Sequence, residues 1–183
     1  YDTGKTYIYR TKNINEPWEK RSLDGVYHHP SLLFDEDGRI YMGYGFNEVR
    51  ILELNDTLTA PKEGGFERLL VEEKQDAYIS YEGAHFYKKD GTYYIFVIQW
   101  LKGNLTQREQ LCLYGDSLDG EFKKEMVFSE NLGFPMKGVA QGGIVDTPEG
   151  DWYSVMYQEH GAIGKMPVLV PVSWDKKRPV FGD

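Results

Sequence analysis

Three segments of the chain share one plan, which is an apolar strand, an acidic turn ending in glycine, and an aromatic strand. The turn glycines are Gly38, Gly91 and Gly150, so the plan recurs after 53 and then 59 residues. A repeat of roughly 50 residues built from short strands is typical of β-propeller blades. Further segments of alternating polarity complete each unit, at 48–54, 66–70, 110–114, 121–128 and 168–174.

No stretch longer than about ten residues has helical periodicity, so the pattern predicts a nearly all-β chain. A β-sandwich is the structural alternative, but a sandwich does not repeat at this spacing. The opening segments 6–11 and 18–23 look like the outer strands of a further blade. The count is then about three blades and a fraction, whereas a closed propeller needs at least four. We therefore expect residues 1–183 to form one partial propeller domain, completed by a missing segment or by another chain.

Composition narrows the class of partner. Aromatic residues make up 15% of the 183 residues, which suits a β-rich fold and also sugar binding. The net charge is −8 and no basic cluster exceeds three residues, so nucleic acid is not an expected partner. The longest apolar runs, about six residues, are too short for a membrane span. The sequence contains no signal peptide but opens on Tyr1, which leaves its localisation unknown.

The four histidines lie beside the expected inner strands of successive units: His28, His29, His85 and His160. Inner strands line the channel of a propeller, and ligand sites form where their starts meet. No close pair such as His-x-x-x-His is present, so we predict no metal site. The serine and cysteine nucleophile motifs are also absent. Glu82 precedes a glycine at the start of a strand, where it could equally be a solvated loop acid. Carboxylate acid/base work in an aromatic-lined cleft is the remaining chemistry, and it points to glycosides.

Four segments in this order resemble glycoside hydrolase family 43, at 27–41, 82–88, 141–148 and 158–174. The likeness runs from about residue 6 to the C-terminus. It implies a five-bladed β-propeller that hydrolyses xylose- or arabinose-containing glycosides with inversion, as β-xylosidases and α-L-arabinofuranosidases do. An oligosaccharide or polysaccharide is then the expected substrate.

The resemblance also implies residue roles. Glu82 corresponds to the general acid of the family's Glu-Gly-x-His segment. The general base is an aspartate in the family's first blade, ahead of the matched segments, so no residue of this chain is named as base. His29 stands where the family has the aspartate that modulates the general acid. A histidine there could orient Glu82 through a hydrogen bond, but it supplies no negative charge. Two functions therefore stay open, a glycosidase and a carbohydrate-binding propeller without turnover.

Further residues are expected to contact the sugar. Lys165 stands where members of the resembled family often have arginine, and lysine lacks the bidentate fork of arginine. Core packing is the alternative role for the aromatic candidates. Ala140 stands where some members hold a central cation through histidine, so we expect no cofactor, and a structural calcium stays open without a ligand from this chain. The full set of predicted substrate contacts is Tyr27, His28, His85, Trp100, Gln141, His160 and Lys165.

Overall fold

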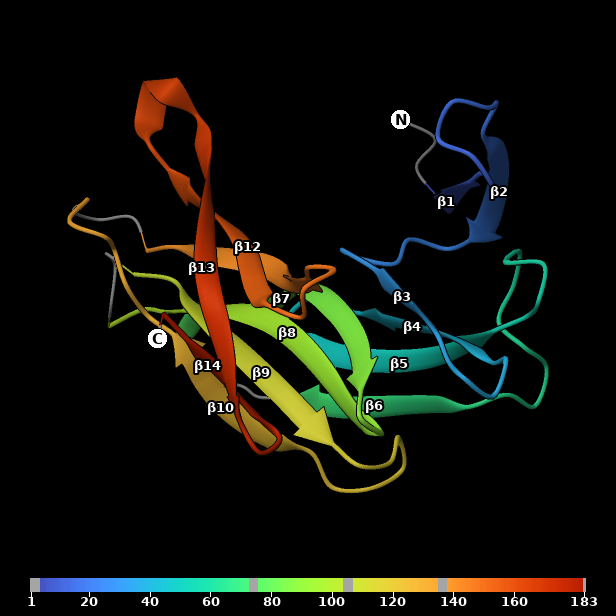
Figure 1. Cartoon of the computed structure of the whole chain (residues 1–183). Helices are drawn as coiled ribbons and strands as arrows, with labels where there is room; N and C mark the ends of the chain where they lie inside the picture. The colour runs from blue at the N-terminus through green and yellow to red at the C-terminus, as the bar shows by residue number, and fades with distance from the viewer. Residues whose placement is uncertain (1–3, 73–75, 104–106, 135–137, 183) are drawn as a thin grey trace.

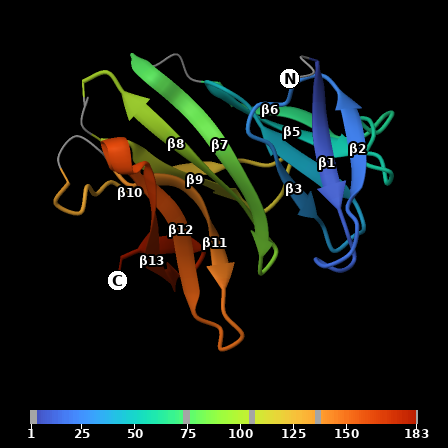
Figure 2. The same cartoon turned by 90° about the horizontal axis from the view of Figure 1, so that it is seen from above.

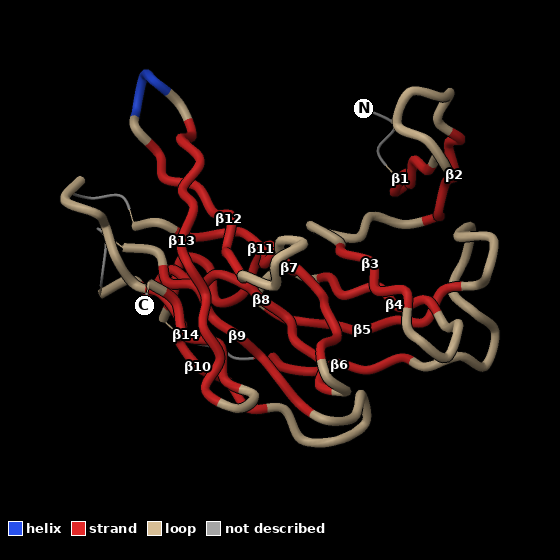
Figure 3. Tube along the Cα trace, viewed as in Figure 1, coloured by secondary structure: helices blue, strands red, loops and turns tan. Residues whose placement is uncertain are grey.

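The computed structural model describes residues 4–72, 76–103, 107–134 and 138–182. In these ranges the chain forms fourteen strands and a single 3₁₀ turn, η1 (Gly161–Ile163), and no α-helix (Figure 3). None of the described residues belongs to a helix that is long and apolar enough to cross a membrane. The strands are β1 (Lys5–Arg10), β2 (Glu19–Asp24), β3 (Ser31–Phe34), β4 (Ile40–Tyr44), β5 (Glu48–Leu54), β6 (Glu67–Glu72), β7 (Ala77–Lys89), β8 (Thr92–Leu101), β9 (Glu109–Gly115), β10 (Lys123–Phe128), β11 (Ala140–Asp146), β12 (Trp152–Glu159), β13 (Lys165–Asp175) and β14 (Arg178–Phe181).

The three predicted hairpins are confirmed. Between β7 and β8 the turn residues Asp90 and Gly91 have φ of 49° and 76°, and two positive φ angles are the mark of the type I′ hairpin turn. In the other two turns a glycine N–H donates back to the residue three positions earlier. These bonds run from Gly38 to the carbonyl of Asp35 (3.0 Å) and from Gly150 to that of Thr147 (2.9 Å).

Each unit folds into an antiparallel sheet whose strands follow sequence order, β3–β6, β7–β10 and β11–β14, and β1 pairs with β2 alone. The first strands β3, β7 and β11 are edge strands of their sheets, and β7 contacts β3 of one neighbouring sheet and β11 of the other. They are therefore the inner strands of three blades (Figures 1 and 2). The sheets fan around these strands without closing a ring, so the chain is an incomplete propeller, as the repeat count predicts.

The main core lies between the first two full blades, where Tyr41, Ile51, Tyr81 and Ile95 are all fully buried. These side chains come from β4, β5, β7 and β8, and they hold the two sheets face to face. Burial raises the pKa of Tyr41 to about 12. Strands β5, β8 and β9 contribute every second residue to this layer, as the alternation of a strand requires, whereas Tyr81 and Ala84 of β7 are three residues apart.

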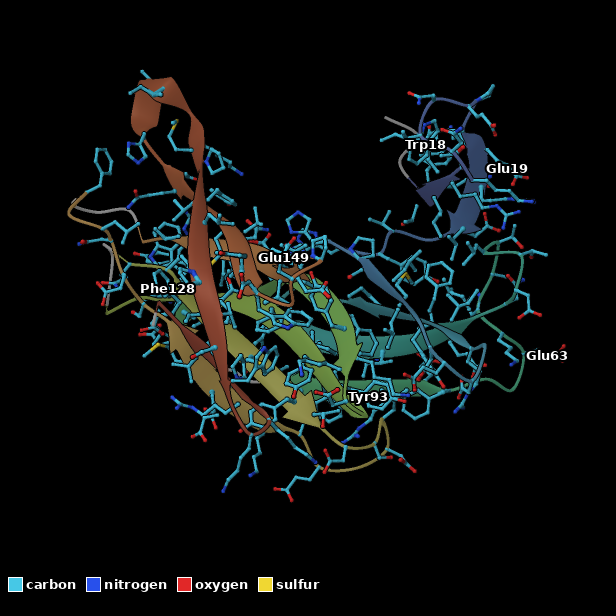
Figure 4. The ribbon with its side chains drawn as sticks, viewed as in Figure 1. Trp18, Glu19, Glu63, Tyr93, Phe128 and Glu149 are labelled. Carbon is cyan, nitrogen blue, oxygen red and sulfur yellow. The ribbon has the colours of Figure 1, made fainter. Side chains whose placement is uncertain are left out.

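A buried carboxylate adds a polar link at the rim of this core. Asp35, in the β3–β4 turn, accepts hydrogen bonds from Lys88 Nζ and from the Tyr93 hydroxyl, both at 2.6 Å. Its own oxygen also accepts the N–H of Glu36 at 2.7 Å. Burial raises the pKa of Asp35, but these bonds outweigh it and hold that pKa below its usual range. Figure 4 labels Tyr93 at this junction, which fixes the β7–β8 hairpin and with it the strand that carries Glu82.

Candidate active site

Glu82 lies on an irregular part of β7. Glu82 pairs with Ile98 of β8, and His85 pairs with Phe96. Three residues along β7 are thus matched by only two along β8. The extra residue forms a bulge, and Gly83 within it has a φ of 72°. A bulge bends a strand and redirects its side chains, and it needs a residue that tolerates positive φ. The Glu82 side chain is thereby held at 15% exposure.

Two histidines approach this carboxylate from the segment before β3. His28 Nε2 lies 2.9 Å from Glu82 Oε1, and His29 Nδ1 lies 3.6 Å from the same oxygen. Their rings stack with centroids 4.2 Å apart. His29 has a φ of 43°, which is uncommon for a residue other than glycine. A strained backbone of this kind is kept only where the surrounding contacts impose it. The structure therefore brings three of the predicted site residues together.

Neighbouring backbone contacts hold this arrangement. The β4–β5 turn supplies two of them, because Gly45 N–H donates to the His28 carbonyl (3.2 Å) and Asn47 N–H donates to the Tyr81 carbonyl (2.8 Å). On the other side of Glu82, Phe86 N–H donates to the Ser31 hydroxyl at 3.0 Å. Ser31, the first residue of β3, thus joins β3 to β7 next to the carboxylate.

The third blade reaches the same cluster through Gln141 on β11. Gln141 Nε2 lies 3.3 Å from His29 Nδ1, and Gln141 Oε1 accepts a hydrogen bond from the Tyr157 hydroxyl at 2.5 Å. Arg108 Nη1 in turn donates to the Tyr157 hydroxyl at 3.0 Å. Arginine can only donate, so the tyrosine must donate onward to the amide oxygen. The amide nitrogen then donates to His29 Nδ1, which therefore carries a lone pair.

The close approach of Gln141 requires a glycine on β7. A Cβ added to Gly83 would lie 2.8 Å from Gln141 Cγ and from Gln141 Nε2, which is too close for carbon. Gln141 itself has a φ of 62°. Three residues in the left-handed region, His29, Gly83 and Gln141, thus lie in one cluster. Such concentration of backbone strain is characteristic of functional sites.

Positive charge gathers beside the third blade. The Arg108 side chain is 11% exposed and lies 3.5 Å from Glu159, and its Nη2 is buried without a hydrogen-bond partner among the described residues. Lys165 Nζ lies 4.3 Å from the centre of the Tyr157 ring. Lys165 is one of the residues that the sequence predicted, whereas Arg108 and Tyr157 are not. Arg108 belongs to no sequence motif. The one indication for Tyr157 is that the alternation along its strand places it on the face that is not buried.

The remaining predicted contacts are spread more widely. His85 points inward on β7, and burial lowers its pKa, with a smaller contribution in the same direction from His29. The Tyr27 ring packs edge-on against Tyr44 (4.9 Å) in a hydrophobic core cluster, which favours its alternative core role. Trp100 packs against Tyr78, with ring centroids 5.1 Å apart.

His160 lies at the end of β12, beside the 3₁₀ turn that closes the long β12–β13 hairpin. Its Nε2 is 2.9 Å from Gln158 Oε1, and its ring stacks on Phe134 at 4.1 Å. β12 is the second strand of its blade and pairs with the inner strand β11, and His160 lies beyond the last residue of β12 that this pairing includes, Tyr157.

One cluster of described residues could hold a metal ion, and it is the same three residues. His28, His29 and Glu82 each offer one ligand atom, all within 4.8 Å of one another. Ala140 is fully buried on β11 and offers no ligand. A partly buried carboxylate in contact with imidazole and open to solvent can also donate or accept a proton.

Comparison with known proteins gives a family match. The sequence matches the profile described as "Glycosyl hydrolases family 43" over residues 2–178. It is 25% identical to a protein of Formosa agariphila named "Beta-xylosidase", over 100% of this chain and 37% of the relative. It is 26% identical to a Butyrivibrio fibrisolvens protein named "Xylosidase/arabinosidase", over 97% of this chain and 39% of the relative. The chain thus spans less than two fifths of the length of either relative.

Solved structures agree in fold. A "Bifunctional GH43-CE" protein from Bacteroides eggerthii is 38% identical and superposes with a TM-score of 0.88, covering 100% of this chain and 23% of that chain. A xylan beta-1,4-xylosidase from Bacillus halodurans has a TM-score of 0.75 at 21% identity, over 98% of this chain and 38% of that chain. The second likeness concerns the fold alone.

Proposed function

This chain belongs to glycosyl hydrolase family 43, and on that premise we propose that it carries the general acid, Glu82, of an inverting glycosidase. One observation supports the proposal above the others. His28 and His29, from the segment that leads into β3 of the first full blade, contact the partly buried carboxylate of Glu82 on the inner strand of the second blade. Gln141, on the inner strand of the third blade, joins the same cluster through His29. These residues are far apart in the sequence, and the binding of one ligand by all of them would explain why they lie together.

In the proposed reaction Glu82 protonates the leaving oxygen of the glycoside. A second carboxylate, roughly 6.5–9.5 Å away in inverting enzymes, would activate water on the opposite face of the sugar. We name no residue of this chain as that base. Gln141 and Lys165 lie on the third-blade side of Glu82 and would bind sugar hydroxyls. The names of the relatives favour xylose- or arabinose-containing substrates.

Hydrolysis of nitrophenyl β-xyloside and α-arabinofuranoside by the full-length protein tests the proposal. We expect Glu82→Gln to lower kcat by about 10²- to 10⁴-fold, the usual contribution of a general acid. The matched control is Glu149→Gln, in the exposed β11–β12 turn, which should leave kcat unchanged. Full activity of Glu82→Gln would refute the assignment.

A specific observation keeps the second candidate, a carbohydrate-binding propeller without turnover. His28 already engages Glu82 Oε1, and His29 occupies the place of the family's aspartate. Substrate binding without any hydrolysis would establish this candidate and exclude the first. His29→Asp distinguishes further, because the glycosidase should become faster if His29 limits the rate.

A further inference from the structure

We propose that His28, His29 and Glu82 form a binding site for a divalent transition metal of the Zn²⁺ type. The three side chains present two imidazole nitrogens and one carboxylate oxygen at one point of the surface. Two histidines and one glutamate are a recurrent ligand set for zinc, which then keeps an open coordination position. The binding itself does not depend on the glycosidase activity proposed above.

The geometry needs little rearrangement. The ligand atoms lie within 4.8 Å of one another, and zinc at its usual distance of about 2.0–2.2 Å requires them to close on the ion. The two imidazoles can make this movement because their side chains are 41% and 48% exposed. Glu82 is 15% exposed and stays as the fixed ligand. Calcium and magnesium prefer all-oxygen sites, so the two nitrogens select against them.

The hydrogen-bond chain from the third blade supports the same conclusion. Because Arg108 donates to Tyr157 and Tyr157 to Gln141, the amide presents a hydrogen to His29 Nδ1. That nitrogen therefore carries a lone pair in place of a proton, which is what a metal needs, although the lone pair accepts the amide hydrogen when no ion is bound. The ion would take the place of the amide hydrogen. His28, which now contacts Glu82 through Nε2, would bind with its proton moved to Nδ1 or released to solvent.

Other soft ligands among the described residues are poorly suited. Cys112 is fully buried on β9, and burial raises the pKa of its thiol well above the ordinary value. His85 is half-buried and is not part of the three-residue cluster, and the Nε2 of His160 is engaged by Gln158. The proposed site is therefore separable from the rest of the chain by mutation.

Occupation of the site has a consequence that does rest on the proposed function. The ion would bind the oxygen with which Glu82 is proposed to protonate the leaving group. Metal binding should then inhibit hydrolysis reversibly, with activity restored by a chelator.

Binding is tested on the chelator-treated protein with Co²⁺, followed by visible absorption, and with Zn²⁺ as competitor. We expect one ion per chain and at least tenfold weaker binding for His28→Asn and for His29→Asn. The matched control is His160→Asn, which removes a histidine from the β12–β13 hairpin and should bind as the wild type does. Unchanged affinity in the His28→Asn/His29→Asn double variant, or an equal loss in His160→Asn, would overturn the proposal.

A second measurement needs no variant and so survives any folding defect. Paramagnetic Co²⁺ should shift the imidazole NMR signals of His28 and His29 and leave those of His160 in place, whereas the reverse would overturn the site. These readouts hold whether or not the protein hydrolyses glycosides. Full hydrolysis at saturating Zn²⁺ would refute the inhibition while leaving the metal site to stand on its binding data.

Discussion

Replacing Asp35 by asparagine measures how strongly one buried carboxylate joins two blades. The Asp35 side chain is fully buried, and its partner Lys88 is 18% exposed. The substitution keeps the shape of the side chain but removes its charge and turns one acceptor into a donor. Lys88 and Tyr93 then compete for a single oxygen, and the Lys88 charge loses its buried partner.

The expected cost follows from this burial. Removing one partner of a buried ion pair costs about 3–5 kcal/mol. Asparagine retains one acceptor and Lys88 reaches solvent, so we expect the lower end, about 3 kcal/mol. With a urea dependence of about 2 kcal/mol/M, the midpoint of unfolding should fall by about 1.5 M.

The stability difference between the wild type and Asp35→Asn should also depend on pH, in a direction that the pKa of Asp35 determines. The pKa of Asp35 is lowered in the folded protein, so its carboxylate stabilises the fold above the unfolded-state pKa of about 3.9. This stabilisation is lost as the pH falls through the lower pKa of the folded state. The wild type and Asp35→Asn should therefore differ most near neutral pH and converge in acid.

Urea unfolding followed by circular dichroism at several pH values is the assay. The control is Asp37→Asn in the same turn, whose exposed ion pair with Arg39 should contribute about 0–1 kcal/mol. Equal losses in the two variants, or a difference between wild type and Asp35→Asn that grows in acid, would refute the reasoning.

The remaining predictions concern the cluster around Glu82. Gly83→Ala should cost about 1–3 kcal/mol in urea unfolding, because it combines a φ of 72° with a clash against Gln141. Gly91→Ala, at a similar φ but with nothing within 4 Å, should cost less, and equal costs would count against the clash. Tyr157→Phe leaves the Arg108 guanidinium with one partner fewer and should cost about 1–3 kcal/mol, also measured by urea unfolding. An unchanged midpoint for Tyr157→Phe would show that the hydroxyl is not needed to hold Arg108.

Local signals predicted the blades well. The strand 48–54 was predicted with the bounds that β5 has, and the hairpin turns were found at all three glycines. The predicted ends of the strands were less accurate. The strand expected over 121–128, for example, begins only at Lys123. Strand ends depend on where pairing with the neighbour stops, and no local signal marks that point.

The sequence was less informative where a side chain acts between blades. From the sequence, Asp35 is one of several acidic residues in a hairpin turn. In the structure it is buried and accepts hydrogen bonds from Lys88 and Tyr93, which are more than fifty residues away. Solvated turn acids and buried ones have the same local pattern. Only the approach of a second blade distinguishes them.

By itself the sequence determined the hairpins, the repeat and the position of Glu82 on an inner strand, because turn sterics and alternation act over a few residues. Only the tertiary structure decided what surrounds Glu82. The bulge at Gly83 and the strained backbone of His29 direct side chains from residues as distant as 29 and 141 to one point. That convergence depends on how the sheets pack around their inner strands, which no short segment encodes.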